Sequence, residues 1–311
     1  VIFQERRRYI FDTNQRACDQ TITDLVKELK TRVQLRFDVD ALINKLKENP
    51  ELPVEEKVEL WDKIKVLSIA RIVGVAYSYS LLTVTLKAQI SILAAEVCAQ
   101  FEHPPPPTFF ESLSNVKTQV ATLLGWDSAS SASDSHNAGA IAANRKVFVQ
   151  CTQYLLTTGI AKLLNFVEST CKDVSSTLLL TGEVTGDKMR ELFDAVDRVI
   201  AKRDSSFFTD MVAPLTESER SSGDGVLQLL TRLIKSIESE KCRGTLTSLV
   251  DFYLTAATHK MPRDSIVLAK LLPSFPDIFD FVASDAYDSP LQNSLCSSDI
   301  YQYANFVFKT L

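Results

Sequence analysis

The feature that most constrains this 311-residue chain is the stretch from Pro53 to Phe101, which holds one glycine and no further proline. Proline is tolerated in the first turn of a helix, and the four consecutive prolines at 104–107 would end one. At ~1.5 Å per residue, such a helix would run about 70 Å, longer than a compact domain is wide. Its centre, Ile72 to Leu86, carries no charge but is shorter than the roughly 20 residues of a membrane span. We therefore predict a buried central helix.

The rest of the chain also favours helices, because glycine is scarce and apolar residues recur at helical spacing. We expect further helices at 1–37, 39–48, 109–124, 145–180, 186–203, 224–242, 244–258, 264–272 and 297–311. The fold class expected is all-α, a single elongated helical bundle built around the long central helix. We expect one domain over residues 1–311, with mobile loops near 102–107 and 127–143.

Composition and motifs argue against several classes of function. A net charge of −5 makes nucleic acid an improbable partner. The six cysteines are widely spaced, without a CxxC pair, which favours free buried thiols. The segment Gly182–Lys188 has the wrong spacing for a phosphate-binding loop, and we expect a loop between two helices there. The three histidines fall in or beside expected loops, and neither HExxH nor GxSxG occurs. We predict no enzyme activity, no cofactor and no metal site.

The N-terminal end of the long helix is apolar around too much of its circumference. One side carries Leu60, Ile64 and Leu67. A second side, about 60–180° further round, carries Val54, Val58 and Trp61. The opposite, charged side carries Glu55, Glu59, Asp62 and Lys63. The two apolar sides together exceed the ~100° stripe that a helix needs to face one core. We expect one side to be buried and the other, with Trp61 at its middle, to bind a partner.

Two residues have both a structural and a functional interpretation. A helical tryptophan is commonly a core residue, but Trp61 would also suit a partner-binding anchor, since it offers a large rigid surface. Lys57 and Ile64 share its stripe. Lys270 interrupts the apolar run 266–272, either as a lysine whose head reaches water or as a charge on the rim of a groove.

Several stretches resemble the peroxin-3 family, which docks proteins at the peroxisomal membrane. They are Tyr9–Cys18 (YIFDTNQRAC), Val58–Arg71 (VELWDKIKVLSIAR), Lys87–Ile92 (KAQISI) and Leu268–Pro273 (LAKLLP). The resemblance is strong over 1–100, moderate to 203 and patchy beyond, except near Lys270. The chain departs from the family pattern by an insertion through Asn49–Lys57, at the edge of the expected groove.

The resemblance implies a function as a peroxisome biogenesis factor. The family binds peroxin-19, the soluble carrier of new peroxisomal membrane proteins, by holding its amphipathic N-terminal helix in a groove. By resemblance, the partner-binding residues are Trp61, Lys57, Ile64, Lys270 and Ile43. The implied location is the peroxisomal membrane, with a monomeric domain facing the cytosol. The chain begins with Val1 instead of Met, so we expect its natural N-terminus to be missing. The resemblance implies an N-terminal membrane anchor, which this chain would lack.

Three other interpretations stay open at this point. The chain could be a different helical adaptor or an organelle tether that binds another helix. It could be an enzyme acting on a lipid-like substrate, which needs a closed cavity with converging ionisable groups. It could also contact lipid directly, although the sequence shows no strong basic amphipathic face.

Overall fold

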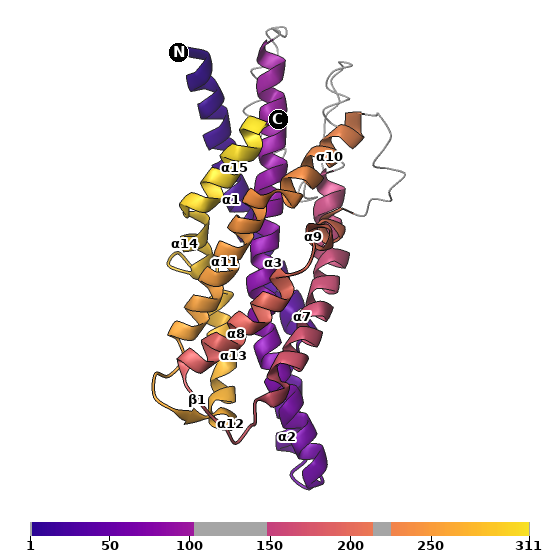
Figure 1. The fold of residues 1–311 in the computed structure, drawn as a ribbon, viewed down its shortest axis with the longest axis vertical. Coiled ribbons are helices and arrows are strands. Elements are labelled where there is room, and N and C mark those ends of the chain that lie inside the picture. Colours follow the sequence, from indigo (N-terminus) through magenta and orange to yellow (C-terminus); the bar gives the residue numbers. More distant parts are fainter. Residues whose placement is uncertain (1, 103–147, 214–224, 311) are drawn as a thin grey trace.

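The chain folds into an elongated helical bundle, described by a computed structural model over residues 2–102, 148–213 and 225–310 (Figure 1). The expected helix at 109–124 and the expected mobile segment at 127–143 lie outside the described residues. The same holds for the expected mobile segment at 102–107, except that Glu102 is the last residue of helix α3. Within the described part, the all-α prediction is confirmed, since the strands are two short segments of two residues each.

The elements follow one another in this order. The first three helices are α1 (Ile2–Arg36), α2 (Val39–Glu48) and α3 (Val54–Glu102). After helical residues 148–154 come a π-helical turn (Leu155–Gly159), α7 (Ile160–Val174), a 3₁₀ turn (Ser175–Thr177), β1 (Glu183–Val184), α8 (Gly186–Ala201) and α9 (Ser205–Val212). The remaining elements are α10 (Gly225–Glu238), α11 (Glu240–His259), β2 (Ile266–Val267), α12 (Leu268–Leu271), a second 3₁₀ turn (Leu272–Ser274), α13 (Phe275–Val282), α14 (Pro290–Leu295) and α15 (Ser298–Thr310).

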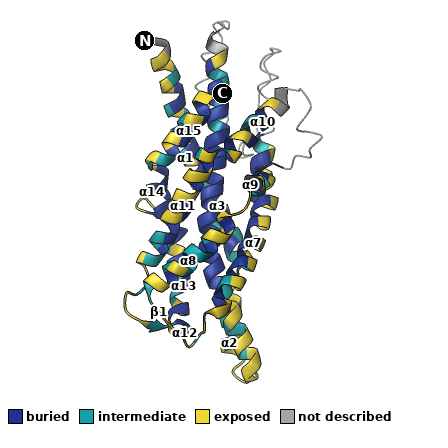
Figure 2. Cartoon of the chain, in the orientation of Figure 1, coloured by how far each residue is buried: buried dark blue, intermediate teal, exposed yellow. Residues whose placement is uncertain are grey.

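Helix α3 forms the centre of the bundle, as the sequence predicts. Every residue from Leu67 to Gln89 is buried, and Figure 2 shows the middle of α3 in the colour of buried residues. Among the described residues, α3 is the one helix with the length and composition to cross a membrane. In this structure 78% of its most apolar window is buried in the bundle. The apolar character of α3 is thus accounted for by its position in a protein core.

In the described part of the chain, seven helices pack against α3, namely α1, α2, α7, α10, α11, α13 and α15 (Figure 1). Their apolar sides form one large core cluster with it. A smaller cluster joins the start of α1 to the ends of α3 and α15 through Phe11, Cys98 and Phe308. Each surrounding helix therefore needs only one apolar side, whereas the middle of α3 is apolar on all sides.

Two buried charged groups of α3 are paired with α1 and α2. The Lys87 ammonium lies 2.7 Å from Asp19 Oδ1 and 3.3 Å from the Gln15 carbonyl oxygen of α1. The Arg71 guanidinium donates to the Phe37 carbonyl oxygen at 3.0 Å and lies 3.3 Å from Asp40 Oδ2. Because an unpaired buried charge is strongly unfavourable, these bonds fix how α1 and α2 sit against α3.

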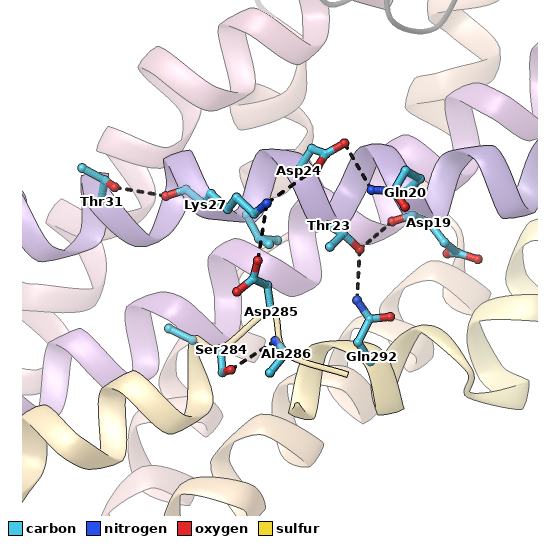
Figure 3. Close-up of polar contacts among 12 residues, drawn as sticks. Asp19, Gln20, Thr23, Asp24, Lys27, Thr31, Ser284, Asp285, Ala286 and Gln292 are labelled. Carbon is cyan, nitrogen blue, oxygen red and sulfur yellow. Dashed lines mark hydrogen bonds and ion pairs between the residues drawn. The ribbon is translucent and has the colours of Figure 1, made fainter. Parts of the chain in front are cut away.

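On its outer side, α1 holds the connection between α13 and α14 (Figure 3). Gln292 Nε2 donates to Thr23 Oγ1 at 3.2 Å, and the Lys27 ammonium lies 3.6 Å from Asp285 Oδ2. The Lys27–Asp285 pair is well exposed and contributes little to stability by itself. The contacts show that the C-terminal elements pack directly on the N-terminal helix.

The structure differs from the sequence prediction in the C-terminal half. The predicted helix 264–272 is replaced by β2 and the short helix α12, and β2 pairs antiparallel with β1. Helices α9, α13 and α14 were not predicted. The helices α13 and α14 each have proline in their first turn. A cluster of prolines in the sequence favours a loop, although proline is also tolerated at the start of a helix. The expected loop at 182–188 contains β1, after which Thr185 caps α8 by accepting a hydrogen bond from the Lys188 N–H at 3.2 Å.

Replacing Gly159 by alanine should destabilise the protein. A Cβ atom at Gly159 would lie 2.0 Å from the Met211 carbonyl oxygen, so α9 would have to move. We expect Gly159→Ala to lower the free energy of unfolding by about 1–3 kcal/mol, measured by urea denaturation followed by circular dichroism. The matched control is Gly244→Ala, where a Cβ meets no atom within 4 Å and alanine should stabilise α11 by about 0.5–1 kcal/mol. Equal effects of the two changes would contradict this account.

Removing the Lys87 ammonium should leave Asp19 without its buried partner. Burial raises the pKa of the Asp19 carboxyl, and the nearby Lys87 ammonium opposes that rise. We expect Lys87→Met to lower the free energy of unfolding by about 1–2 kcal/mol, since it removes the partner of a carboxylate that is only partly buried, with 35% of its side chain exposed. The double variant Asp19→Asn/Lys87→Met should lose less than the two single variants summed. Additive losses in this double-mutant cycle would show that the pair is not coupled.

Candidate functional site

The α2–α3 hairpin lies at one end of the bundle, drawn at the bottom of Figure 1 together with α12 and β1. Asp38 begins α2 by accepting a hydrogen bond from the Ala41 N–H at 2.9 Å. The helix ends at a short turn in which the Leu52 N–H donates to the Asn49 carbonyl oxygen at 3.3 Å. We call this end of the bundle the hairpin end.

The start of α3 has two different apolar sides, as the sequence predicts. Ile64 is 0% exposed and Leu67 is 5% exposed, so this side belongs to the core. Val54 is 74% exposed, Val58 is 49% exposed, and Trp61 is half-buried. We call these last three residues the hairpin face. An exposed apolar surface of this kind, next to a large aromatic side chain, is typical of a binding site.

The predicted site residues on the two hairpin helices have different surroundings. Ile43 of α2 is half-buried and packs against the same core as Trp61. Ile64 lies in that core and has no exposed surface, so in this structure it supports the hairpin face from inside. Its position differs from the direct partner contact that the family resemblance implies.

Lys57 is held by the turn between the two helices. Its ammonium donates to the Pro50 carbonyl oxygen at 2.6 Å, and its side chain is half-buried. An ammonium has three N–H donors, so this bond does not exhaust the hydrogen bonds that Lys57 can make. Lys57 therefore fixes the turn that contains the apparent insertion and still places a positive charge beside Trp61.

Lys270 is exposed and lies on α12, a different element at the same end of the bundle. The neighbouring Ala269 N–H donates to the Leu180 carbonyl oxygen at 3.0 Å, and the Leu268 N–H donates to the Gly182 carbonyl oxygen at 2.9 Å. These bonds attach α12 to the segment that follows α7. The structure thus brings Lys270 to the hairpin end.

Sequence reasoning missed two residues at this end. Lys65 is buried, and its ammonium donates to the Leu178 carbonyl oxygen at 2.8 Å. Leu179, the next residue, is 67% exposed. The run of three leucines at 178–180 is too short to show a period, so its pattern could not identify the exposed member.

Five of the six cysteine thiols are buried, and Cys296 is exposed. Burial raises the pKa of Cys18 and of Cys242 to about 12 and that of Cys151 to about 11, so these thiols stay protonated at neutral pH. Across residues 2–102, 148–213 and 225–310, the His, Cys, Asp and Glu side chains form no group of three that could hold a metal ion. What the hairpin end does offer is an exposed apolar surface beside two lysines.

Comparison with known proteins points to a single family. Residues 47–274 match the protein family described as Peroxin-3. The chain is 30% identical over 96 residues to Peroxisomal biogenesis factor 3 of Rattus norvegicus and of Homo sapiens, which is 31% of this chain and 25% of each relative. It is 29% identical over 94 residues to Peroxisome biogenesis protein 3-1 of Arabidopsis thaliana, which is 30% of this chain and 26% of that relative.

The aligned segment thus spans about a quarter of the length of these curated relatives. The family match is longer, covers well over half of the chain, and includes the hairpin face, Lys57 and Lys270. On this ground, the chain belongs to the peroxin-3 family.

Proposed function

We propose that this protein is a peroxisome biogenesis factor that docks the amphipathic N-terminal helix of peroxin-19. In this role it delivers new peroxisomal membrane proteins to the membrane. It resides at the peroxisomal membrane through an N-terminal anchor, with the helical bundle in the cytosol. The observation that carries the proposal is the hairpin face, where Val54 and Val58 are exposed beside the half-buried Trp61.

The hairpin face suits an amphipathic helix for two physical reasons. Its residues at 54, 58 and 61 follow helical spacing along one side of α3, so they form a strip parallel to a helix axis. Trp61 packs against the core on one side, which holds its ring in place and lowers the entropy lost on binding. The partner's apolar side chains would cover this strip, and Ile43 would contribute from α2.

The two lysines supply the polar part of the recognition. Lys57 lies beside Trp61, and Lys270 lies on α12 at the same end. An amphipathic helix with acidic residues beside its apolar stripe would place negative charges near both. Charges on the rim of an interface mainly set orientation and the rate of association, while the apolar anchor carries most of the affinity.

Truncating Trp61 should abolish most of the docking affinity without unfolding the protein. Removal of a central aromatic anchor typically costs about 2–4 kcal/mol, so we expect Trp61→Ala to weaken binding about 30-fold or more. The measurement is calorimetric titration with the N-terminal helix peptide of peroxin-19. The matched control is Phe306→Ala on α15, which removes a 38%-exposed aromatic side chain from another helix and should leave binding unchanged. Tight binding by a folded Trp61→Ala variant would contradict the site, and no binding by the wild type would contradict the function.

Reversing the charge of Lys270 should slow association with the peptide. We expect Lys270→Glu to lower the association rate several-fold at low salt, with a smaller effect at high salt as the charges are screened. The equivalent change Lys309→Glu, at an exposed position on α15, provides the control and should have little effect. Surface plasmon resonance at two salt concentrations measures both. If the two variants behave alike, Lys270 has no specific role in docking.

A further inference from the structure

Leu179 is an exposed apolar side chain on a well-anchored turn. It is 67% exposed, yet hydrogen bonds hold the backbone on both sides of it. The Leu178 N–H donates to the Ser175 carbonyl oxygen at 3.0 Å, and the Gly182 N–H donates to the Leu179 carbonyl oxygen at 3.0 Å. The bonds from Leu268 and Ala269 of α12 attach the same turn from the other side. A side chain that is already positioned loses little entropy when a partner covers it.

Lys65 places this turn beside the hairpin face. Its side chain is 6% exposed, and its ammonium lies 3.0 Å from Asp62 Oδ1 as well as 2.8 Å from the Leu178 carbonyl oxygen. Helical side chains lean toward the N-terminus, and the contact with Asp62 shows that Lys65 does so. The Leu178 carbonyl oxygen therefore lies at the level of the turn of α3 that carries Trp61 and Asp62.

Trp61 lies between Lys57 and Lys65 along α3, one turn from each. At 100° per residue, Trp61 is about 40° round α3 from Lys57, and Lys65 is about 40° further in the same direction. Lys57 binds the α2–α3 turn at Pro50, and Lys65 binds Leu178. Lys65 thus lies on the same side of α3 as Val58 and Trp61, one turn after Trp61, so the turn that carries Leu179 meets α3 where the hairpin face ends.

We infer that Leu179 forms a second apolar wall of the docking surface and that Lys65 is the positioning residue that holds this wall in place. The inference rests on the proposed function, and its occupant is the same amphipathic helix of peroxin-19. The partner's apolar stripe would cover Val58 and Trp61 and extend to Leu179. The turn also connects this stripe to Lys270 through Ala269, so apolar contact and positive charge lie on one continuous surface that matches an apolar stripe with acidic flanks.

The test is titration of the folded protein with the N-terminal helix peptide of peroxin-19. We expect Leu179→Ala to weaken binding about fivefold or more and Lys65→Met to weaken it by a similar factor. Because Lys65 acts through Leu179, the double variant should bind about as weakly as Leu179→Ala alone. Lys65→Arg, which can still donate to the Leu178 carbonyl oxygen, should retain most of the affinity. Tyr287→Ala, which removes a 91%-exposed side chain from another loop, is the control and should bind as the wild type does.

Hydrogen exchange separates positioning from a general loss of stability. Lys65→Met should speed exchange of the Leu178, Gly182 and Ala269 amides while leaving the amides of α11 and α15 unchanged. Faster exchange throughout the protein would overturn the positioning role, as would additive losses of affinity in the double variant.

Unchanged affinity of Leu179→Ala, with the wild type binding normally, would overturn the second wall. Absence of wild-type binding would instead reject the proposed function, and dimerisation of the wild type that Leu179→Ala abolishes would assign the surface to a second copy.

Discussion

The burial of α3 on all sides is the constraint on which the rest of this structure depends. A helix buried from Leu67 to Gln89 has no solvated side, so its charged groups and tyrosine hydroxyls need partners within the protein. Lys87 and Arg71 meet this requirement through α1 and α2, and the Tyr79 hydroxyl through the carbonyl oxygens of Val26 and Ala283, at 3.2 and 3.1 Å. These bonds have partners far away in the sequence, so they specify where the surrounding helices lie as well as stabilising them.

The candidate site follows from the point at which this burial ends. Towards its N-terminus, α3 extends beyond most of the helices that surround it, and α2 covers only part of its circumference. Apolar residues that would be core elsewhere are therefore exposed at Val54 and Val58. Exposure of aliphatic side chains is unfavourable in a free monomer, and a partner that covers them recovers the hydrophobic free energy. The middle of α3 thus supplies the core of the bundle, and its N-terminal end supplies a surface for binding.

Much of this arrangement could be predicted from the sequence, because it depends on long-period patterns. The extent of α3 and the two apolar sides around Trp61 follow from residue spacing alone. The residues that the sequence could not place depend on contacts between distant segments. Leu179 lies in a turn whose Leu178 carbonyl oxygen is held by Lys65, a residue 113 positions earlier, and β1 forms by pairing with β2. Helix α13 could not be predicted because the proline at its start favours a loop in the sequence. Its packing against α3 and α11, which stabilises it as a helix, is seen only in the structure.

The stretches that carry the family resemblance have two separate structural roles. Gln15 in the first stretch donates from Nε2 to Ser91 Oγ in the third at 3.1 Å, and its carbonyl oxygen accepts a hydrogen bond from Lys87. These two stretches therefore bind each other and build the frame of the bundle, away from the hairpin face. The second stretch contains Trp61 and Lys65, and the fourth contains Lys270, so these two bring together the surface proposed for docking. A family match by itself does not distinguish frame from surface. The distinction comes from exposure, since only the second and fourth stretches present side chains at the hairpin end.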